Sequence, residues 1–323
     1  MGRILIITVR AKGGGAEKII DSIVKLDPFK YQWINMESFL NEKFIYRYIK
    51  LMWIILKNIN NFDKIVIGSE GPLGIFISPF KLFYRKKIIL WNHCYFEDYK
   101  RFLSKKNQLL YRLSYLLYPL RINASPASKN GQFIANPYVF SDREVSNTFL
   151  DKEFTILLSV SSLAKLKSVD LTIKLLSKLP SNIELNIYGD GIERKALENL
   201  VDETLVRDRT RFFGFVNEPF CQHSDDARIL IINSQTEALP TIILESIEHG
   251  IPIIVKSYNG SDYWSSYQSV FILEEITPEK VLEIINYFKC LSHIEYSDLF
   301  HSDIKNLSEL HSYDNFIRRL AEF

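Results

Sequence analysis

Cysteine is scarce in this chain of 323 residues, and its placement excludes several classes of protein. The three cysteines, Cys94, Cys221 and Cys290, are far apart and odd in number, which suits neither a disulfide framework nor a CxxC zinc or redox site. Long apolar runs are also missing, because no stretch reaches the roughly eighteen apolar residues of a membrane span and the apolar N-terminal run is too short for a signal-peptide core. We therefore expect a cytoplasmic protein in a reducing compartment.

Acidic side chains are few in the first half of the chain. Residues 1–145 hold 23 Lys and Arg against 11 Asp and Glu, whereas the remainder holds 17 against 27. A basic half beside an acidic half suggests a polyanionic partner for the first, either a membrane surface or nucleic acid. We do not expect nucleic acid as a partner, since no recognisable reader motif accompanies the charge.

Residues 43–57 combine cations with aromatic side chains. Lys43, Arg47, Lys50 and Lys57 fall at helical spacing in this stretch. Such a helix either lies in the interface of an anionic membrane, or packs on the core while its lysines are solvated.

Short β-branched runs alternate with segments long enough for helices, the rhythm of a parallel α/β sheet. The pattern pauses after Asn136-Pro137, so we place a domain boundary between residues 145 and 146 and expect two αβα domains with a substrate between them. The tail, from about residue 278, is expected to be helical and able to return to the N-terminal domain. Strands are expected at residues 3–9, 31–35, 64–68, 87–91, 121–124, 154–160, 184–188, 211–214, 229–233 and 251–256.

The most informative segment is residues 236–252, TEALPTIILESIEHGIP. Pro240 suits the first position of a helix and Gly250 its C-terminal cap. Glu237 is therefore expected in the loop before the helix and Glu245 inside it, beside a helix N-terminus that can hold an anion.

This segment is one of several that resemble a known family. Ser159 to Lys167 (SVSSLAKLK), Tyr188-Gly189-Asp190-Gly191, residues 212–216 (FFGFV) and TEALPTIILE follow in an order that resembles the donor domain of family 4 retaining glycosyltransferases of the GT-B fold. In the first half, Gly14-Gly15 is similar to that family's N-terminal glycine loop and Trp91-Asn92-His93 to its histidine-bearing strand end.

The resemblance implies a role for each matching residue. Glu245 would accept the ribose hydroxyls of a nucleotide sugar, Glu237 would hold donor-sugar hydroxyls, and Lys167 would neutralise the diphosphate leaving group. His93 would contact the donor sugar or the acceptor. The implied catalytic residues are Glu237, Lys167 and His93; the implied donor-binding residues are Gly14, Gly15, Ser162, Lys165, Gly189, Ala238, Leu239, Pro240, Thr241 and Glu245. No metal and no cofactor are expected.

Two positions depart from the family pattern. Ser162 stands where an arginine is usual, with Lys165 near enough to compensate, and Ala238 stands where a glycine is usual. A non-catalytic partner subunit of another transferase therefore stays an alternative, as does a nucleotide-sugar epimerase. A nicotinamide dehydrogenase with Glu37 as its ribose acid is disfavoured, because G-x-G-x-x-G needs a glycine where Lys18 stands.

The expected function is a metal-independent retaining glycosyltransferase that uses a nucleotide-diphosphate sugar, with UDP-sugar as the favoured donor. The expected acceptor is a growing bacterial surface glycan, either free or lipid-linked, as in capsule or lipopolysaccharide assembly. With a lipid-linked acceptor, the basic half would contact the inner face of the cytoplasmic membrane.

Overall fold

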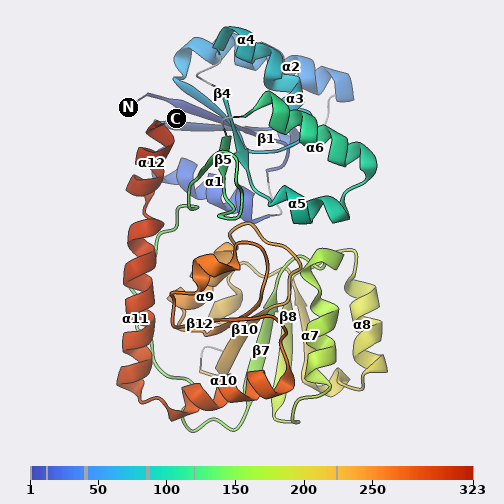
Figure 1. The fold of residues 1–323 in the computed structure, drawn as a ribbon, viewed down its shortest axis with the longest axis vertical. Coiled ribbons are helices and arrows are strands. Elements are labelled where there is room, and N and C mark those ends of the chain that lie inside the picture. The colour runs from blue at the N-terminus through green and yellow to red at the C-terminus, as the bar shows by residue number, and fades with distance from the viewer. Residues whose placement is uncertain are drawn as a thin grey trace. The chain divides into compact units, whose positions relative to one another are not determined.

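The computed structural model describes residues 2–11, 14–39, 43–84, 88–119, 121–222 and 225–322. It divides into two compact units, the first formed by Met1–Val139 with His311–Phe323 and the second by Phe140–Leu310 (Figure 1). The expected boundary, between residues 145 and 146, thus falls inside the second unit. Residues before it are held there by side chains, since Glu248 accepts hydrogen bonds from both the backbone N–H and the hydroxyl of Ser141.

The first unit contains one parallel sheet of six strands, in the order β2-β1-β3-β4-β5-β6. The chain runs from β1 to β2 on one side and continues from β3 on the other, so the strand order reverses between β1 and β3. Because helices cover both faces, the central strands β1, β3 and β4 consist mostly of buried Ile, Leu and Val. The strands are β1 (Ile4–Thr8), β2 (Tyr31–Asn35), β3 (Lys64–Ile67), β4 (Ile88–Asn92), β5 (Arg121–Asn123) and β6 (Gln132–Phe133).

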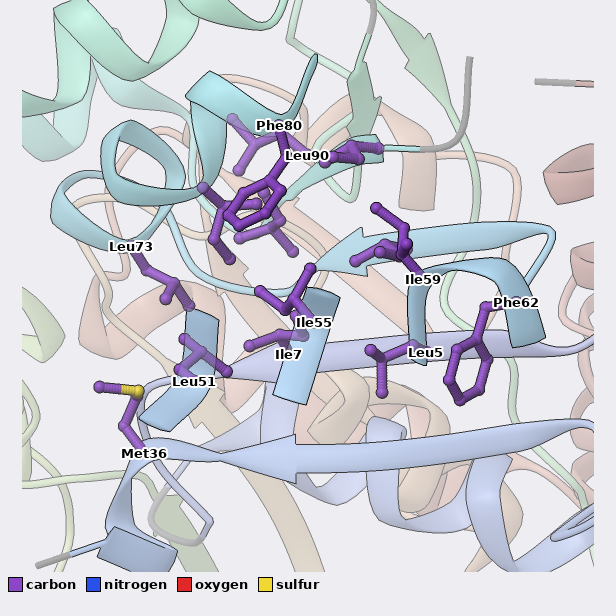
Figure 2. Packing of buried hydrophobic residues seen from close by; sticks show 14 of the residues in the cluster. Leu5, Ile7, Met36, Leu51, Ile55, Ile59, Phe62, Leu73, Phe80 and Leu90 are labelled. Atoms are coloured by element: carbon purple, nitrogen blue, oxygen red, sulfur yellow. The ribbon is translucent and has the colours of Figure 1, made fainter. Parts of the chain in front are cut away.

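Side chains alternate between the two faces of this sheet. Leu5 and Ile7 point to a core closed by Leu51 and Ile55, on the face covered by α2, α3, α4 and α6 (Figure 2). Ile4 and Ile6 belong to a second core, closed by α1 and by the C-terminal helix α12. The helices are α1 (Gly15–Leu26), α2 (Phe44–Asn58), α3 (Pro72–Ile77), α4 (Lys81–Tyr84), α5 (Phe96–Tyr99), α6 (Lys105–Leu117) and α12 (Tyr313–Ala321), with short turns η1 (Met36–Phe39), η2 (Ile59–Asn61), η3 (Ser78–Phe80) and η4 (Lys100–Phe102).

The second unit repeats the architecture with a different strand order, β12-β11-β10-β7-β8-β9, again parallel throughout. Here the order reverses between β7 and β10. The strands are β7 (Thr155–Val160), β8 (Ile183–Tyr188), β9 (Thr210–Gly214), β10 (Ala227–Ile232), β11 (Ile253–Lys256) and β12 (Val270–Leu273). The helices are α7 (Val169–Leu176), α8 (Arg194–Glu203), α9 (Thr241–Glu248), α10 (Pro278–Cys290) and α11 (His293–Leu310), with turns η5 (Lys165–Lys167), η6 (Arg207–Arg209), η7 (Pro219–Cys221) and η8 (Ser261–Trp264).

The predicted fold class, two α/β units with parallel sheets, is confirmed. Among the described residues, no helix combines the length and the apolar character that crossing a bilayer requires.

Candidate functional site

In the second unit, the loops that follow β7 and β10 meet where the strand order reverses. Ligands of open parallel sheets bind outside the carboxyl ends of the strands at such a point. Two hydrogen bonds join the loops: the backbone N–H of Gln235 donates to the carbonyl of Leu166 at 2.8 Å, and the Gln235 amide donates to the Ser168 hydroxyl at 3.0 Å. The two loops therefore form one structural element, and every predicted donor-binding residue of this unit except Gly189 and Glu245 lies on it or at its end.

Lys167 and Glu237 form an ion pair at the centre of this element. The Nζ of Lys167 lies 2.5 Å from Oε1 of Glu237, and the two side chains are only 20% and 13% exposed. Sequence reasoning predicted both residues for the site without predicting that they touch. A ligand that offers a phosphate to the ammonium group and hydroxyls to the carboxylate would satisfy both charges at once.

Helix α9 presents its N-terminus next to Glu237. Pro240 is the N-cap and Thr241 the first helical residue, one position later than predicted, and no described side chain caps this end. Because proline carries no N–H, the first free donor of the helix belongs to Thr241. Thr241 and Glu245 share the partly exposed face of α9, whereas Leu239 is buried and anchors the loop. A carboxylate and backbone N–H donors thus lie one helical turn apart.

Gly189 is required by backbone packing. Its φ is +127°, and a Cβ at this position would lie 1.8 Å from the carbonyl oxygen of Ser161. The close approach lets the loop after β8 support the loop after β7, through hydrogen bonds such as Leu163 N–H to the Asp190 carbonyl at 2.9 Å. Ser162 and Lys165 are exposed on the supported loop.

In the first unit, the predicted glycine loop follows β1. Gly14 is the N-cap of α1 in an extended conformation and Gly15 is the first residue of that helix, while Gly13 lies outside the described residues. Glu37, which a dehydrogenase would need for a ribose, instead accepts a hydrogen bond from the backbone N–H of Ala11 at 2.7 Å. That carboxylate therefore binds the chain three residues beyond the end of β1.

His93 lies one residue beyond β4. Its ring centroid is 4.6 Å from that of Trp91, and its Nε2 is buried with no hydrogen-bond partner among the described residues. Burial lowers the pKa of His93 to about 4, so the ring is neutral at pH 7. A neutral imidazole with one unused nitrogen is suited to a hydroxyl group rather than to a phosphate.

Glu70 is a residue that sequence reasoning missed. It follows β3, and its carboxylate accepts a hydrogen bond from the backbone N–H of His93. Burial raises the pKa of Glu70, and the backbone N–H groups of His93 and Cys94 partly oppose that rise. Part of the signal was available, because Ser69-Glu70-Gly71 directly follows a predicted strand.

Residues 141–289 match the family model of the glycosyl transferases group 1, and this range includes both Lys167 and Glu237. That part of the chain is therefore similar to the glycosyl transferases group 1. The whole chain has the GT-B fold: it superposes on the crystal structure of Anabaena HepE in complex with UDP-glucose with a TM-score of 0.77, 15% identity and coverage of 99% of this chain and 98% of that one.

Two curated proteins are similar to part of the chain. The O-antigen biosynthesis glycosyltransferase WclY of Escherichia coli is 30% identical over 147 residues, which are 45% of this chain and 40% of that protein. The lipopolysaccharide core biosynthesis glycosyltransferase LpsD of Rhizobium meliloti is 35% identical over 89 residues, 27% of this chain and 25% of that protein. The chain thus matches less than half the length of these curated relatives.

Proposed function

We propose that this protein is a family 4 retaining glycosyltransferase that transfers a sugar from a UDP-sugar to a growing bacterial surface glycan. The observation that carries the proposal is the Lys167–Glu237 pair, which lies at the switch point of a group 1 glycosyltransferase domain. UDP is the favoured nucleotide because HepE, a structural neighbour, is in complex with UDP-glucose. The surface glycan is favoured because WclY and LpsD are named for O-antigen and lipopolysaccharide core biosynthesis.

The geometry supports a division of labour within the second unit. As the bond between sugar and diphosphate breaks, the leaving group gains negative charge, which Lys167 and the N-terminus of α9 are placed to stabilise. Donor-sugar hydroxyls would replace Lys167 as the partner of Glu237 and free the ammonium group for the phosphate. Glu245, one turn along α9, would accept the ribose hydroxyls. These side chains and backbone groups supply the positive potential, so no metal is part of the proposal.

We further propose that the acceptor is lipid-linked. The support is the excess of cations in residues 1–145, which suits work at the inner, anionic face of a cytoplasmic membrane. His93, neutral and with a buried unused nitrogen, would then meet a hydroxyl of either sugar.

Thermal unfolding with a panel of nucleotides and nucleotide sugars tests the proposal. A ligand that binds only the native state raises the melting temperature, so UDP and one or more UDP-sugars should do so. Glu245→Ala should weaken UDP binding at least tenfold in calorimetry, because a charge-assisted hydrogen bond contributes roughly 1.5 to 3 kcal/mol. Glu203→Ala, the same change at an exposed position of α8, is the matched control and should bind UDP as the wild type does.

Three results would point elsewhere. Absence of stabilisation by every nucleotide sugar would favour the non-catalytic partner subunit that Ser162 and Ala238 suggest. Conversion of a UDP-sugar to its epimer without an acceptor would favour an epimerase. Unchanged UDP affinity in Glu245→Ala would remove this residue from the site.

A further inference from the structure

Three helices of the first unit carry cations and contain no acidic residue. The helices α2, α4 and α6 include no Asp or Glu but seven cations, namely Arg47, Lys50, Lys57, Lys81, Lys105, Lys106 and Arg112. The same holds for the longer stretches around them, residues 43–62, 71–96 and 99–141. The cationic excess of the first half is therefore concentrated in particular segments.

These helices lie on the same face of the sheet. Leu51 and Ile55 of α2 and Phe80 just before α4 belong to the core cluster on that face (Figure 2). Tyr118, just after α6, belongs to the same cluster. The other face is covered by α1 and α12, which carry both signs of charge. The helices without acidic residues thus share one outward surface of the unit.

That outward surface is rich in apolar side chains. On α2, Tyr46, Ile49, Trp53 and Leu56 follow one another at intervals of three or four residues, and Trp53 and Leu56 are 58% and 55% exposed. Leu82 and Phe83 of α4 are 84% and 83% exposed. α2 is thus apolar on its outer face as well as on its buried one, and clustered exposed apolar side chains of this kind mark an interaction surface.

We propose that the outer surface of α2, α4 and α6 inserts its apolar side chains into the interface of an anionic lipid bilayer. A bilayer offers the two things this surface lacks, an apolar layer and negative charge above it. The Nζ of Lys57 lies 4.9 Å from the ring centroid of Trp53. Such a pair suits the bilayer interface, where the ring can contact acyl chains while the cation contacts headgroups.

A second copy of the chain suits this surface less well. A two-fold dimer pairs a surface with itself, so helices that carry Lys and Arg but no Asp or Glu would face one another. Nucleic acid would offer phosphate groups to the cations but no apolar layer to the exposed side chains of Ile49, Trp53 and Leu56. The inference deepens the proposal of a lipid-linked acceptor and rests on it, but binding to lipid can be measured without any transfer reaction.

Flotation of the full-length protein with vesicles tests the surface. We expect the wild type to float with vesicles of phosphatidylglycerol and phosphatidylcholine at low salt, to be released as salt screens the charge, and to bind pure phosphatidylcholine weakly. Trp53→Ser combined with Leu56→Ser should lower the partition coefficient on the anionic vesicles at least tenfold. The control combines Leu205→Ser with Ile294→Ser in the second unit, where the side chains are even more exposed, at 90% and 73%, and it should bind as the wild type does.

Each contrary result has a distinct meaning. Failure of the wild type to float, or an equal loss in test and control variants, would overturn the proposed surface. So would a Trp53→Ser, Leu56→Ser variant that floats normally but changes from an oligomer to a monomer in light scattering, which would assign the surface to self-association. UDP binding is measured on the same proteins. Absence of UDP binding would count against the proposed transferase function, whereas the flotation result would still decide the membrane surface.

Discussion

The two units share an architecture but differ in how the ends of their strands are used. In the second unit, the switch point holds a charged pair, Lys167 with Glu237, beside a helix N-terminus. In the first, the ends of β3 and β4 hold a buried cluster in which Glu70 accepts the backbone N–H of His93 and the histidine is neutral. The same layered fold therefore holds two differently charged arrangements of side chains, and the difference lies in the loops.

The loops are also held by different means. Backbone packing at Gly189 fixes the loops of the second unit, since only a glycine fits against the Ser161 carbonyl. Side-chain hydrogen bonds fix those of the first, where Asn92 accepts from the Tyr115 hydroxyl at 3.0 Å and its amide donates to Asn123 at 3.0 Å. Backbone packing leaves a glycine signature in the sequence, whereas a hydrogen-bond network can be built from many residue types.

The largest effect is expected at Lys167, because we propose that only the second unit stabilises the charge of the leaving diphosphate. Lys167→Ala should lower turnover about a hundredfold, with a smaller rise in the Michaelis constant for the donor, because the lost interaction strengthens as the diphosphate leaves. Steady-state kinetics with the UDP-sugar found by thermal screening measures this. Lys174→Ala, which breaks the exposed pair with Asp170 on α7, is the control. Equal turnover in wild type and Lys167→Ala would remove Lys167 from catalysis.

Local backbone signals in the sequence were sufficient for prediction, whereas contacts between residues distant in the sequence were not. The helix limits around Pro240 and Gly250 were predicted to within about two residues, because proline and glycine act through their own backbone geometry. The Lys167–Glu237 contact was not predicted, because the two residues are 70 positions apart and only the tertiary fold brings them together.

In the first unit, Glu70 was missed for a related reason. Its importance depends on β3 and β4 being neighbours in the sheet, which the order of segments along the chain does not fix. Residues 43–57 left two interpretations open, and the structure shows one helix that is buried on one face and apolar on the other. A periodicity argument cannot separate those faces when both are apolar.

A second prediction uses the buried histidines of the first unit. Burial lowers the pKa of His93 and of His311 to about 4, below the unfolded value of about 6.5. The unfolded chain therefore binds protons first as the pH falls. The free energy of unfolding that these neutral histidines contribute is complete above pH 6.5 and declines toward pH 4. Each histidine should cost about 2 kcal/mol between pH 7 and pH 5, whereas the raised pKa of Glu70 acts in the opposite direction.

Urea unfolding at the two pH values measures the effect. Trp264 is the one tryptophan of the second unit, so in a Trp264→Phe background the fluorescence reports on the first. His311→Gln, which keeps a donor for the Asn136 carbonyl, should remove about half of the histidine contribution. A pH dependence identical to that of the parent protein would mean that His311 titrates normally in the folded state.

The smallest effect is expected at the cysteines, and it tests whether Glu70 holds the turn at His93. Cys94 of the first unit is partly buried and its thiol pKa is raised well above the ordinary value, by burial first and by Glu70 second, whereas Cys221 and Cys290 of the second unit are exposed. With both exposed cysteines changed to serine, Cys94 should react slowly with a thiol reagent. Glu70→Ala should speed that reaction about tenfold, the equivalent of about 1.4 kcal/mol in local opening, because the turn loses a charge-assisted hydrogen bond.

Glu70→Gln keeps an acceptor and removes only the charge, so it should shift the pH at which the thiol becomes reactive without raising the rate at high pH. If the two variants gave the same profile, the carboxylate would act on Cys94 through its charge alone, and the turn at His93 would be held by Asn92 and Tyr115 instead.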